Sequence, residues 1–235
     1  MNDFVIDAPA SVSLPIVGSN ARFPVRRIYC VGRNYADHAV EMGIDPRSEP
    51  PFFFLKPADA VLQPGESFPY PPGSQNVHHE VELVVALGQG GKDIPFAAAL
   101  DHVFGYTVGL DMTRRDLQLA ARAKGRPWDV GKAFDHSAPL AALVPAAICG
   151  HPNQGRIWLD VNGARRQSAD LRDLIWPVAE VIGLLSQLFE LRPGDIIMTG
   201  TPAGVGPVVP GDSVEAGIDG VATLSLVIGG RDGDH

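Results

Sequence analysis

Residues 156–167 read RIWLDV-NG-ARRQ and carry the strongest short-range structural signal in the sequence. Two strand-like runs, Arg156–Val161 and Ala164–Gln167, flank Asn162-Gly163. This dipeptide readily adopts the positive φ angles of a type I′ turn, which joins antiparallel strands. We therefore predict a β-hairpin here, and a second one that turns at Asp219-Gly220.

Outside the hairpins, the hydrophobic pattern predicts short strands and a few separated helices. The strand-like segments are residues 28–31, 52–55, 77–87, 103–110 and 195–198, and the helical ones are residues 34–43, 95–100, from 113 onward, and 178–191. These elements favour an α+β fold built on a mixed β-roll. A doubly wound sheet is less favoured, because regular βαβ alternation is missing and Gly204, Gly206 and Gly211 lack the spacing of a nucleotide-binding loop.

The length of 235 residues and the even scatter of 21 prolines and 26 glycines indicate one globular domain with many turns. Prolines and short apolar pieces in residues 1–25 indicate an extended arm lying on the body of the protein. We predict that residues 26–230 form a single catalytic domain.

The formal net charge of −8 argues against nucleic acid or an anionic membrane as the partner. Cys30 and Cys149 form neither a disulfide framework nor a zinc motif, which fits a reducing compartment. Asp3 and Asp7 stand where a signal peptide has basic residues, and no apolar run approaches about 18 residues. A cytoplasmic protein is therefore expected.

Three carboxylates are candidate metal ligands. Glu80 and Glu82 lie two apart in a predicted strand and so share one face, and Asp111 follows another strand. Three such groups converging on one site would suit Mg²⁺ or Mn²⁺, which prefer oxygen ligands. By spacing alone, however, Glu80 and Glu82 also fit a solvated strand face.

His38 and Glu41 are a candidate catalytic pair. Three residues apart on a helix, they are neighbours, so the carboxylate can orient the imidazole for general-base catalysis. A surface pair would show the same spacing.

Cationic and polar groups near the carboxylates are candidates for binding an anionic substrate. Lys132 has the apolar neighbours Trp128 and Phe134, where an ammonium group needs a partner, although a lysine that snorkels from a strand end fits as well. Arg114 or Arg115 can clamp a carboxylate, unless the two only begin a solvated helix. In the turn Thr199–Gly206, Gly200 offers an N–H and Thr201 a hydroxyl, as a purely structural turn also would.

Taken together, these segments resemble the fumarylacetoacetate hydrolase family. The matching blocks span residues 27–228 and occur in the order Gly32-Arg33-Asn34-Tyr35, His38-x-x-Glu41, His79-Glu80-Val81-Glu82, Leu110-Asp111-Met112-Thr113, Gly131-Lys132 and Thr199-Gly200-Thr201-Pro202. The resemblance implies a β-roll, usually homodimeric, with Mg²⁺ or Mn²⁺ held by Glu80, Glu82 and Asp111. It also implies a short lid helix that carries His38 and Glu41.

Within the family, the chain resembles the acylpyruvate hydrolases, and its arm resembles that of bacterial fumarylpyruvate hydrolases of aromatic (gentisate) catabolism. The substrate implied is a small anionic 2,4-dioxo acid, held at its pyruvate end by Lys132, Arg115, Gln118 and Thr201, with Arg33 as a candidate for a distal carboxylate. Alternatives are an oxaloacetate decarboxylase, a ring-fission-product isomerase or decarboxylase, and a noncatalytic metal-binding β domain.

Overall fold

The computed structural model describes residues 4–35 and 47–231 of the chain. Its strands are β1 (Ser13–Pro15), β2 (Arg22–Pro24), β3 (Arg27–Gly32), β4 (Phe52–Lys56), β5 (Val61–Leu62), β6 (Phe68–Tyr70), β7 (Val77–His79), β8 (Val81–Leu87), β9 (Val103–Leu110), β10 (Thr113–Arg114), β11 (Ala138–Pro139), β12 (Val144–Pro145), β13 (Arg156–Val161), β14 (Ala164–Asp170), β15 (Asp195–Met198), β16 (Gly206–Val208), β17 (Ser213–Ile218) and β18 (Ala222–Arg231).

Helices are few and short. The α-helices in the described residues are α2 (Arg115–Ala123), α3 (Asp129–Lys132), α4 (Ala146–Cys149) and α5 (Val178–Leu188), and the 3₁₀ helices are η1 (Ala58–Ala60), η2 (Phe96–His102) and η3 (Leu171–Asp173). None of these helices has the length and apolar character needed to span a membrane. The mixed α+β class predicted from the sequence is confirmed.

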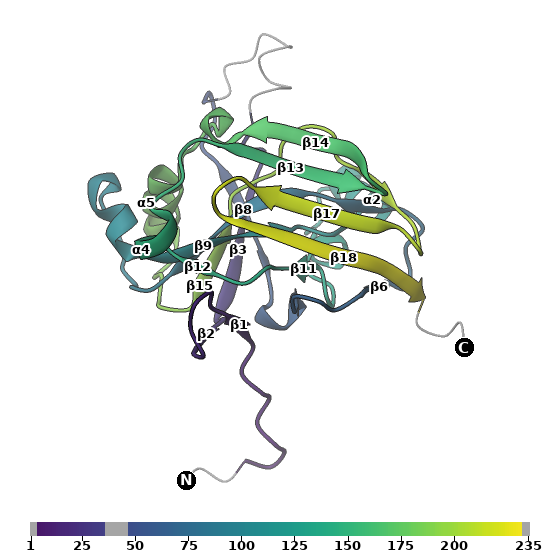
Figure 1. Cartoon of the computed structure of the whole chain (residues 1–235), viewed down its shortest axis with the longest axis horizontal. Coiled ribbons are helices and arrows are strands. Elements are labelled where there is room, and N and C mark those ends of the chain that lie inside the picture. The colour runs from purple at the N-terminus through teal and green to yellow at the C-terminus, as the bar shows by residue number, and fades with distance from the viewer. Residues whose placement is uncertain (1–3, 36–46, 232–235) are drawn as a thin grey trace.

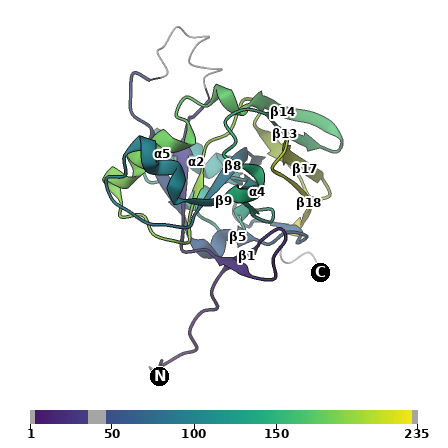
Figure 2. The same ribbon diagram turned by 60° about the vertical axis from the view of Figure 1, so that its left-hand side comes forward.

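Two larger sheets form the roll. A six-stranded sheet has the order β12-β9-β8-β15-β3-β4, and a five-stranded sheet has the order β14-β13-β17-β18-β6. The second sheet crosses in front of β3, β8 and β9 in Figure 1, and in the turned view of Figure 2 this sheet and α5 lie on opposite sides of β8 and β9.

The central strand β8 explains how the layers are held together. All seven of its residues are buried, and the apolar ones alternate between two clusters. Val81, Leu83 and Val85 join the cluster that also contains residues of the five-stranded sheet and α5. Val84 and Ala86 join a second cluster with Leu14 and Phe23 of the β1-β2 pair. Because successive side chains of a strand point to opposite faces, β8 anchors both layers.

Both predicted hairpins are present. Strands β13 and β14 pair antiparallel across the turn, where Asn162 and Gly163 have φ angles of 52° and 74°. These positive angles are those that a type I′ turn requires. Strands β17 and β18 pair in the same way around Asp219-Gly220.

Several predicted elements differ in detail. The run 77–87 is not one strand: it breaks at Glu80 into β7, which pairs with β10 and β16, and β8, which pairs with β9 and β15. Residues 52–55, predicted to be a strand, belong to β4 at the edge of the six-stranded sheet, where Phe52 and Leu55 are exposed. The helix predicted at 95–100 is the 3₁₀ helix η2, and Thr113 begins β10 before α2 starts.

The N-terminal arm has two parts. Strands β1 and β2 pair with each other, and Leu14 and Phe23 are buried against the body. Phe4, Val5 and Ile6, by contrast, are exposed, and the chain before β1 runs away from the body in Figure 1 instead of lying on it.

Candidate metal centre

The pairing of β8 with β9 brings the three predicted metal ligands together. Val81 lies opposite Leu110, and the Asp111 N–H donates to the Glu80 carbonyl at 2.9 Å. Glu80, just before β8, therefore lies beside Asp111, just after β9. Glu82 is two residues further along, so its side chain shares the face of Glu80.

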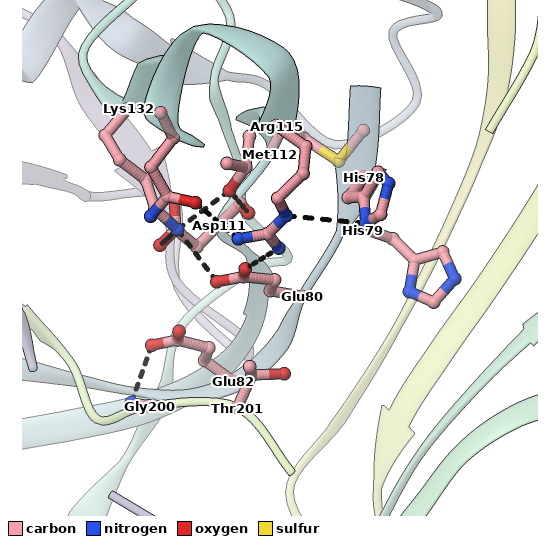
Figure 3. A network of polar contacts seen from close by, with 12 residues as sticks. His78, His79, Glu80, Glu82, Asp111, Met112, Arg115, Lys132, Gly200 and Thr201 are labelled. Carbon is pink, nitrogen blue, oxygen red and sulfur yellow. Dashed lines mark hydrogen bonds and ion pairs between the residues drawn. The ribbon is translucent and has the colours of Figure 1, made fainter. Parts of the chain in front are cut away.

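The three carboxylates form one buried cluster. One oxygen from each of Glu80, Glu82 and Asp111 lies within 4.8 Å of the others, and the residues are 7%, 2% and 1% exposed. A solvated strand face, the alternative that the spacing allowed, is therefore wrong for these residues. Figure 3 shows the carboxylates turned toward one another.

Lys132 binds two of the three carboxylates. At the end of α3, its Nζ lies 2.8 Å from Glu80 Oε2 and 2.5 Å from Asp111 Oδ2, and it donates to Thr113 Oγ1 at 2.7 Å. Only 3% of its side chain is exposed, so it does not snorkel to solvent. The prediction that this ammonium group needs a partner is confirmed.

Helix α2 supplies a second cation. Arg115 donates to Glu80 Oε1 and to Gln118 Oε1, as Figure 3 shows for the carboxylate. Arg115 Nε also approaches His78 Nδ1 at 3.5 Å. Burial first, and then the charge of Arg115, lower the pKa of His78 to about 4, so this imidazole is neutral at neutral pH.

Lys56 is a site residue that sequence reasoning missed. It ends β4, is 1% exposed, and its Nζ lies 2.8 Å from Asp111 Oδ1. Its hydrogen bonds go to the carbonyls of Met112, at 3.3 Å, and Lys132. The sequence offered only a lysine before Pro57, which looked like the end of a strand.

The turn after β15 holds Glu82 and joins a second polar network. The Gly200 N–H donates to Glu82 Oε2 at 2.7 Å. Thr201 Oγ1 accepts from Gln167 Nε2 at 2.8 Å, and Gln167 Oε1 contacts His79 Nδ1 at 2.9 Å. Gln167, which lies in the predicted hairpin, gave no functional signal in the sequence.

Burial and charge give the carboxyl groups different protonation behaviour. Burial, followed by the charges of Asp111 and Glu80, raises the pKa of Glu82 well above its ordinary value of 4.5. Burial would also raise the pKa of Asp111, but the ammonium groups of Lys132 and Lys56 outweigh it and hold that pKa below 3.8. Burial works against the charged form of Lys132, yet Asp111 and Glu80 raise its pKa.

The donor set fits a hard divalent cation. Mg²⁺ and Mn²⁺ take carboxylate oxygens, and these three side chains offer them within one buried space. Asp111 Oδ1 is buried and has the Lys56 ammonium as its partner at 2.8 Å, so the case for a metal rests on the three converging carboxylates. The acidic triad can therefore hold a divalent metal.

The remaining predicted residues are placed as follows. Arg33 follows β3, is exposed, and has a φ of 55°, an angle that residues other than glycine seldom adopt. The Asn34 side chain bonds to Trp176 and to the Thr199 carbonyl. Most of the helix predicted over residues 34–43 lies outside the described residues. His38 and Glu41 lie outside the described residues, so their roles stay predictions.

The sequence also matches a family model over nearly its whole length. Residues 27–228 match the model of the fumarylacetoacetate (FAA) hydrolase C-terminal domain. The chain belongs to this family. The resemblance found in the sequence is thereby confirmed, and known members include hydrolases, isomerases and decarboxylases.

Three members of the family illustrate its range. The solved fumarylpyruvate hydrolase of Pseudomonas aeruginosa, in complex with Mn²⁺ and pyruvate, is 54% identical with a TM-score of 0.92, covering 97% of this chain and 100% of that one. The mitochondrial oxaloacetate tautomerase FAHD1 of Mus musculus is 46% identical over 203 residues, which are 86% of this chain and 91% of the relative. The mitochondrial oxaloacetate decarboxylase of Dictyostelium discoideum is 43% identical over 199 residues, 84% and 91% of the two chains.

Proposed function

We propose that this chain is a metal-dependent hydrolase that cleaves the C3–C4 bond of a 2,4-dioxo acid, with fumarylpyruvate as the substrate and fumarate and pyruvate as the products. One observation carries the proposal: Glu80, Glu82 and Asp111 form a buried carboxylate cluster against Lys132. A fumarylpyruvate hydrolase with 54% identity, solved with Mn²⁺ and pyruvate, supports the choice of substrate.

The pyruvate end of the substrate would bind among the cations around the triad. Lys132 and Arg115 both contact Glu80, so a carboxylate or enolate oxygen entering here meets two positive charges at a largely buried site. Gln118 orients Arg115, and Thr201 offers its hydroxyl beside Gly200. When bound to Glu80, Glu82 and Asp111, Mg²⁺ or Mn²⁺ would supply Lewis-acid stabilisation of the same negative charge.

The attacking water would be activated at the C4 carbonyl, away from the pyruvate end of the substrate. His38, oriented by Glu41, is our candidate for the base that takes a proton from water as it attacks the C4 carbonyl. The tetrahedral intermediate then breaks at C3–C4, and the pair of electrons passes to the pyruvate fragment. Lys132 stabilises that enolate until protonation at carbon gives pyruvate.

Oxaloacetate chemistry is the second candidate, because relatives with 46% and 43% identity are named oxaloacetate tautomerase and oxaloacetate decarboxylase. Each reaction passes through an enolate or enol of a 2-oxo acid, which the same cations would stabilise. The reactions differ in what leaves: an acyl group after water attack, CO₂, or only a proton.

Product analysis separates these candidates. Purified protein with Mn²⁺ is given fumarylpyruvate, acetylpyruvate and oxaloacetate, and the products are followed by NMR. We expect fumarylpyruvate to be the preferred substrate, with fumarate and pyruvate as the products. The Glu41→Ala variant should keep Mn²⁺ binding yet lose most hydrolysis. Turnover of oxaloacetate alone, or hydrolysis that is unchanged in Glu41→Ala, would contradict the proposal or its base.

We also propose that residues 26–230 act as one catalytic domain, that the chain works as a homodimer in the cytoplasm, and that its only substrates are small anions. Two of the relatives are mitochondrial by name, so fractionation of cells is the measurement that tests the location.

A further inference from the structure

A cavity of about 420 Å³ lies between β4 and the segment that joins α2 to α3. Its walls are mainly aromatic. Trp128 packs against Phe52 and Phe54 with ring centroids 5.5 and 6.0 Å apart. The rings cross at interplanar angles of 86° and 60°, and their apolar surfaces suit an unsaturated, conjugated ligand.

The cavity adjoins the candidate metal centre. Lys132 lines it, and the same residue binds Glu80 and Asp111. The Lys132 ammonium lies 5.2 Å from the centroid of the Phe54 ring. A molecule whose pyruvate end meets Lys132 can therefore continue into the aromatic cavity.

The sheet explains this closeness. Phe52 lies opposite Gly32 on β3, and its ring occupies the space that a side chain at position 32 would need. Gly200, whose N–H holds Glu82, follows the neighbouring strand β15. The cavity and the triad thus lie a few strands apart on the same sheet, in which neighbouring strands are roughly 4.8 Å apart.

Arg126 is the cation in the cavity wall whose charge can meet an anionic ligand. Of the charged residues that line it, Lys132 is already matched by two carboxylates, and Asp129 is acidic. Arg126 is exposed, and its guanidinium contacts no acid within residues 4–35 and 47–231. A free guanidinium at an apolar cavity is suited to binding a carboxylate through two hydrogen bonds.

We propose that this cavity receives the acyl arm of the substrate, and that Arg126 binds a carboxylate at the far end of that arm. The inference rests on the proposed function and specifies its substrate class: acylpyruvates whose flat, unsaturated acyl group ends in a carboxylate. Arg126 replaces Arg33 as the candidate for the distal anion, since Arg33 is not among the residues that line the cavity. Oxaloacetate has no such arm and gains nothing from it.

The test compares two substrates that differ in the distal carboxylate. For Arg126→Leu, kcat/KM for fumarylpyruvate should fall about 10- to 100-fold, the loss expected for one charge-assisted hydrogen-bonded pair, chiefly through KM. With acetylpyruvate, which ends in a methyl group, kcat/KM should stay within about twofold. Arg122→Leu, an exposed arginine of α2 outside the cavity, is the matched control and should change neither value. Arg33→Asn, which tolerates the positive φ, is run in parallel.

Three outcomes would overturn the inference. Equal losses with both substrates would mean that Arg126 supports the fold or an interface between copies of the chain, which sedimentation would reveal. No loss with fumarylpyruvate would mean that the distal carboxylate lies elsewhere, and a selective loss in Arg33→Asn would say where. If the unmodified protein cleaves neither acylpyruvate, the proposed function itself fails, which is a distinguishable result.

Discussion

Glu82 differs from its two neighbours in the triad. Glu80 and Asp111 each contact cationic side chains. Within the described residues, the Glu82 carboxylate instead accepts a hydrogen bond from the Gly200 N–H, which Figure 3 shows. Its negative charge is therefore the least compensated of the three, which is why burial raises its pKa so far. A bound divalent metal would change the energy of Glu82 most.

Replacing Glu82 should greatly weaken metal binding without unfolding the protein. Glu82→Gln keeps the side-chain shape and an acceptor for the Gly200 N–H but removes the negative charge. We therefore expect Mn²⁺ affinity to fall about 100-fold or more, which exceeds the usual effect of losing a residue that only hydrogen-bonds to a metal ligand. Isothermal titration calorimetry measures this. Glu215→Gln, on the exposed face of β17, is the control and should bind Mn²⁺ normally. Equal Mn²⁺ affinity in both variants would remove Glu82 from the site.

Lys56 should stabilise the metal-free protein through Asp111. Lys56→Met leaves a buried carboxylate with one cation fewer, a loss that typically costs about 3–5 kcal/mol. We therefore expect a marked fall in Tm without metal, and a larger rise on adding Mn²⁺ than in the unmodified protein. Lys92→Met, at an exposed lysine, should leave Tm nearly unchanged. The same small shift in both variants would rule out this role.

Prediction at the residue scale succeeded where a side chain had a local reason to be special. Glu80 and Glu82, two residues apart, and Lys132, with its apolar neighbours, could be recognised as candidates in the sequence. Lys56 could not, because its partner Asp111 follows a different strand and only the fold joins them. Gln167 was missed for the same reason, since its partner His79 is equally remote.

At the scale of elements, local turn chemistry was the reliable signal. Asn162-Gly163 and Asp219-Gly220 each identified a hairpin because a short turn depends on few distant contacts. The first loop has two residues and the second has three, since Ile218 pairs with Ala222. The break at Glu80 was not predictable. The β pattern continues through it, and only the competing partners of β7 and β8 in different sheets separate the two strands.

The first hairpin gives a direct test of this reasoning. Gly163 has a φ of 74°, so Gly163→Ala should destabilise the protein by about 1–2 kcal/mol through the strain of a left-handed Cβ. Urea denaturation measures the loss. Gly230→Ala is the matched control, because nothing lies within 4 Å of a Cβ there. If both variants unfold at the same urea concentration, the turn does not have the conformation described.

At the scale of the whole molecule, the fold class and the family could be predicted because the signature blocks extend from residue 27 to residue 228. The cavity beside Arg126 could not, because its walls come from β4 and from the segment before α3, which are about 70 residues apart in the chain. The proposal for substrate selectivity therefore needed the structure.

The stability of the whole protein should depend on pH through Glu82. The folded-state pKa is raised, so without metal the stabilising proton is present below the ordinary pKa of 4.5 and is lost as the pH rises through the raised value. Mn²⁺ replaces that proton. The gain in Tm on adding Mn²⁺ should therefore grow from about pH 5 to about pH 8, and this growth should disappear in Glu82→Gln. A gain that shrinks with pH would contradict the assignment.

The most direct test of the account is a metal titration of the reaction itself. Protein treated with EDTA is given fumarylpyruvate, and the loss of its enol absorbance is recorded as Mn²⁺ is added back. The account predicts no turnover before the addition, a saturable rise to full activity with fumarate and pyruvate formed in equal amounts, and no recovery in Glu82→Gln. Hydrolysis at an unchanged rate in EDTA would contradict it.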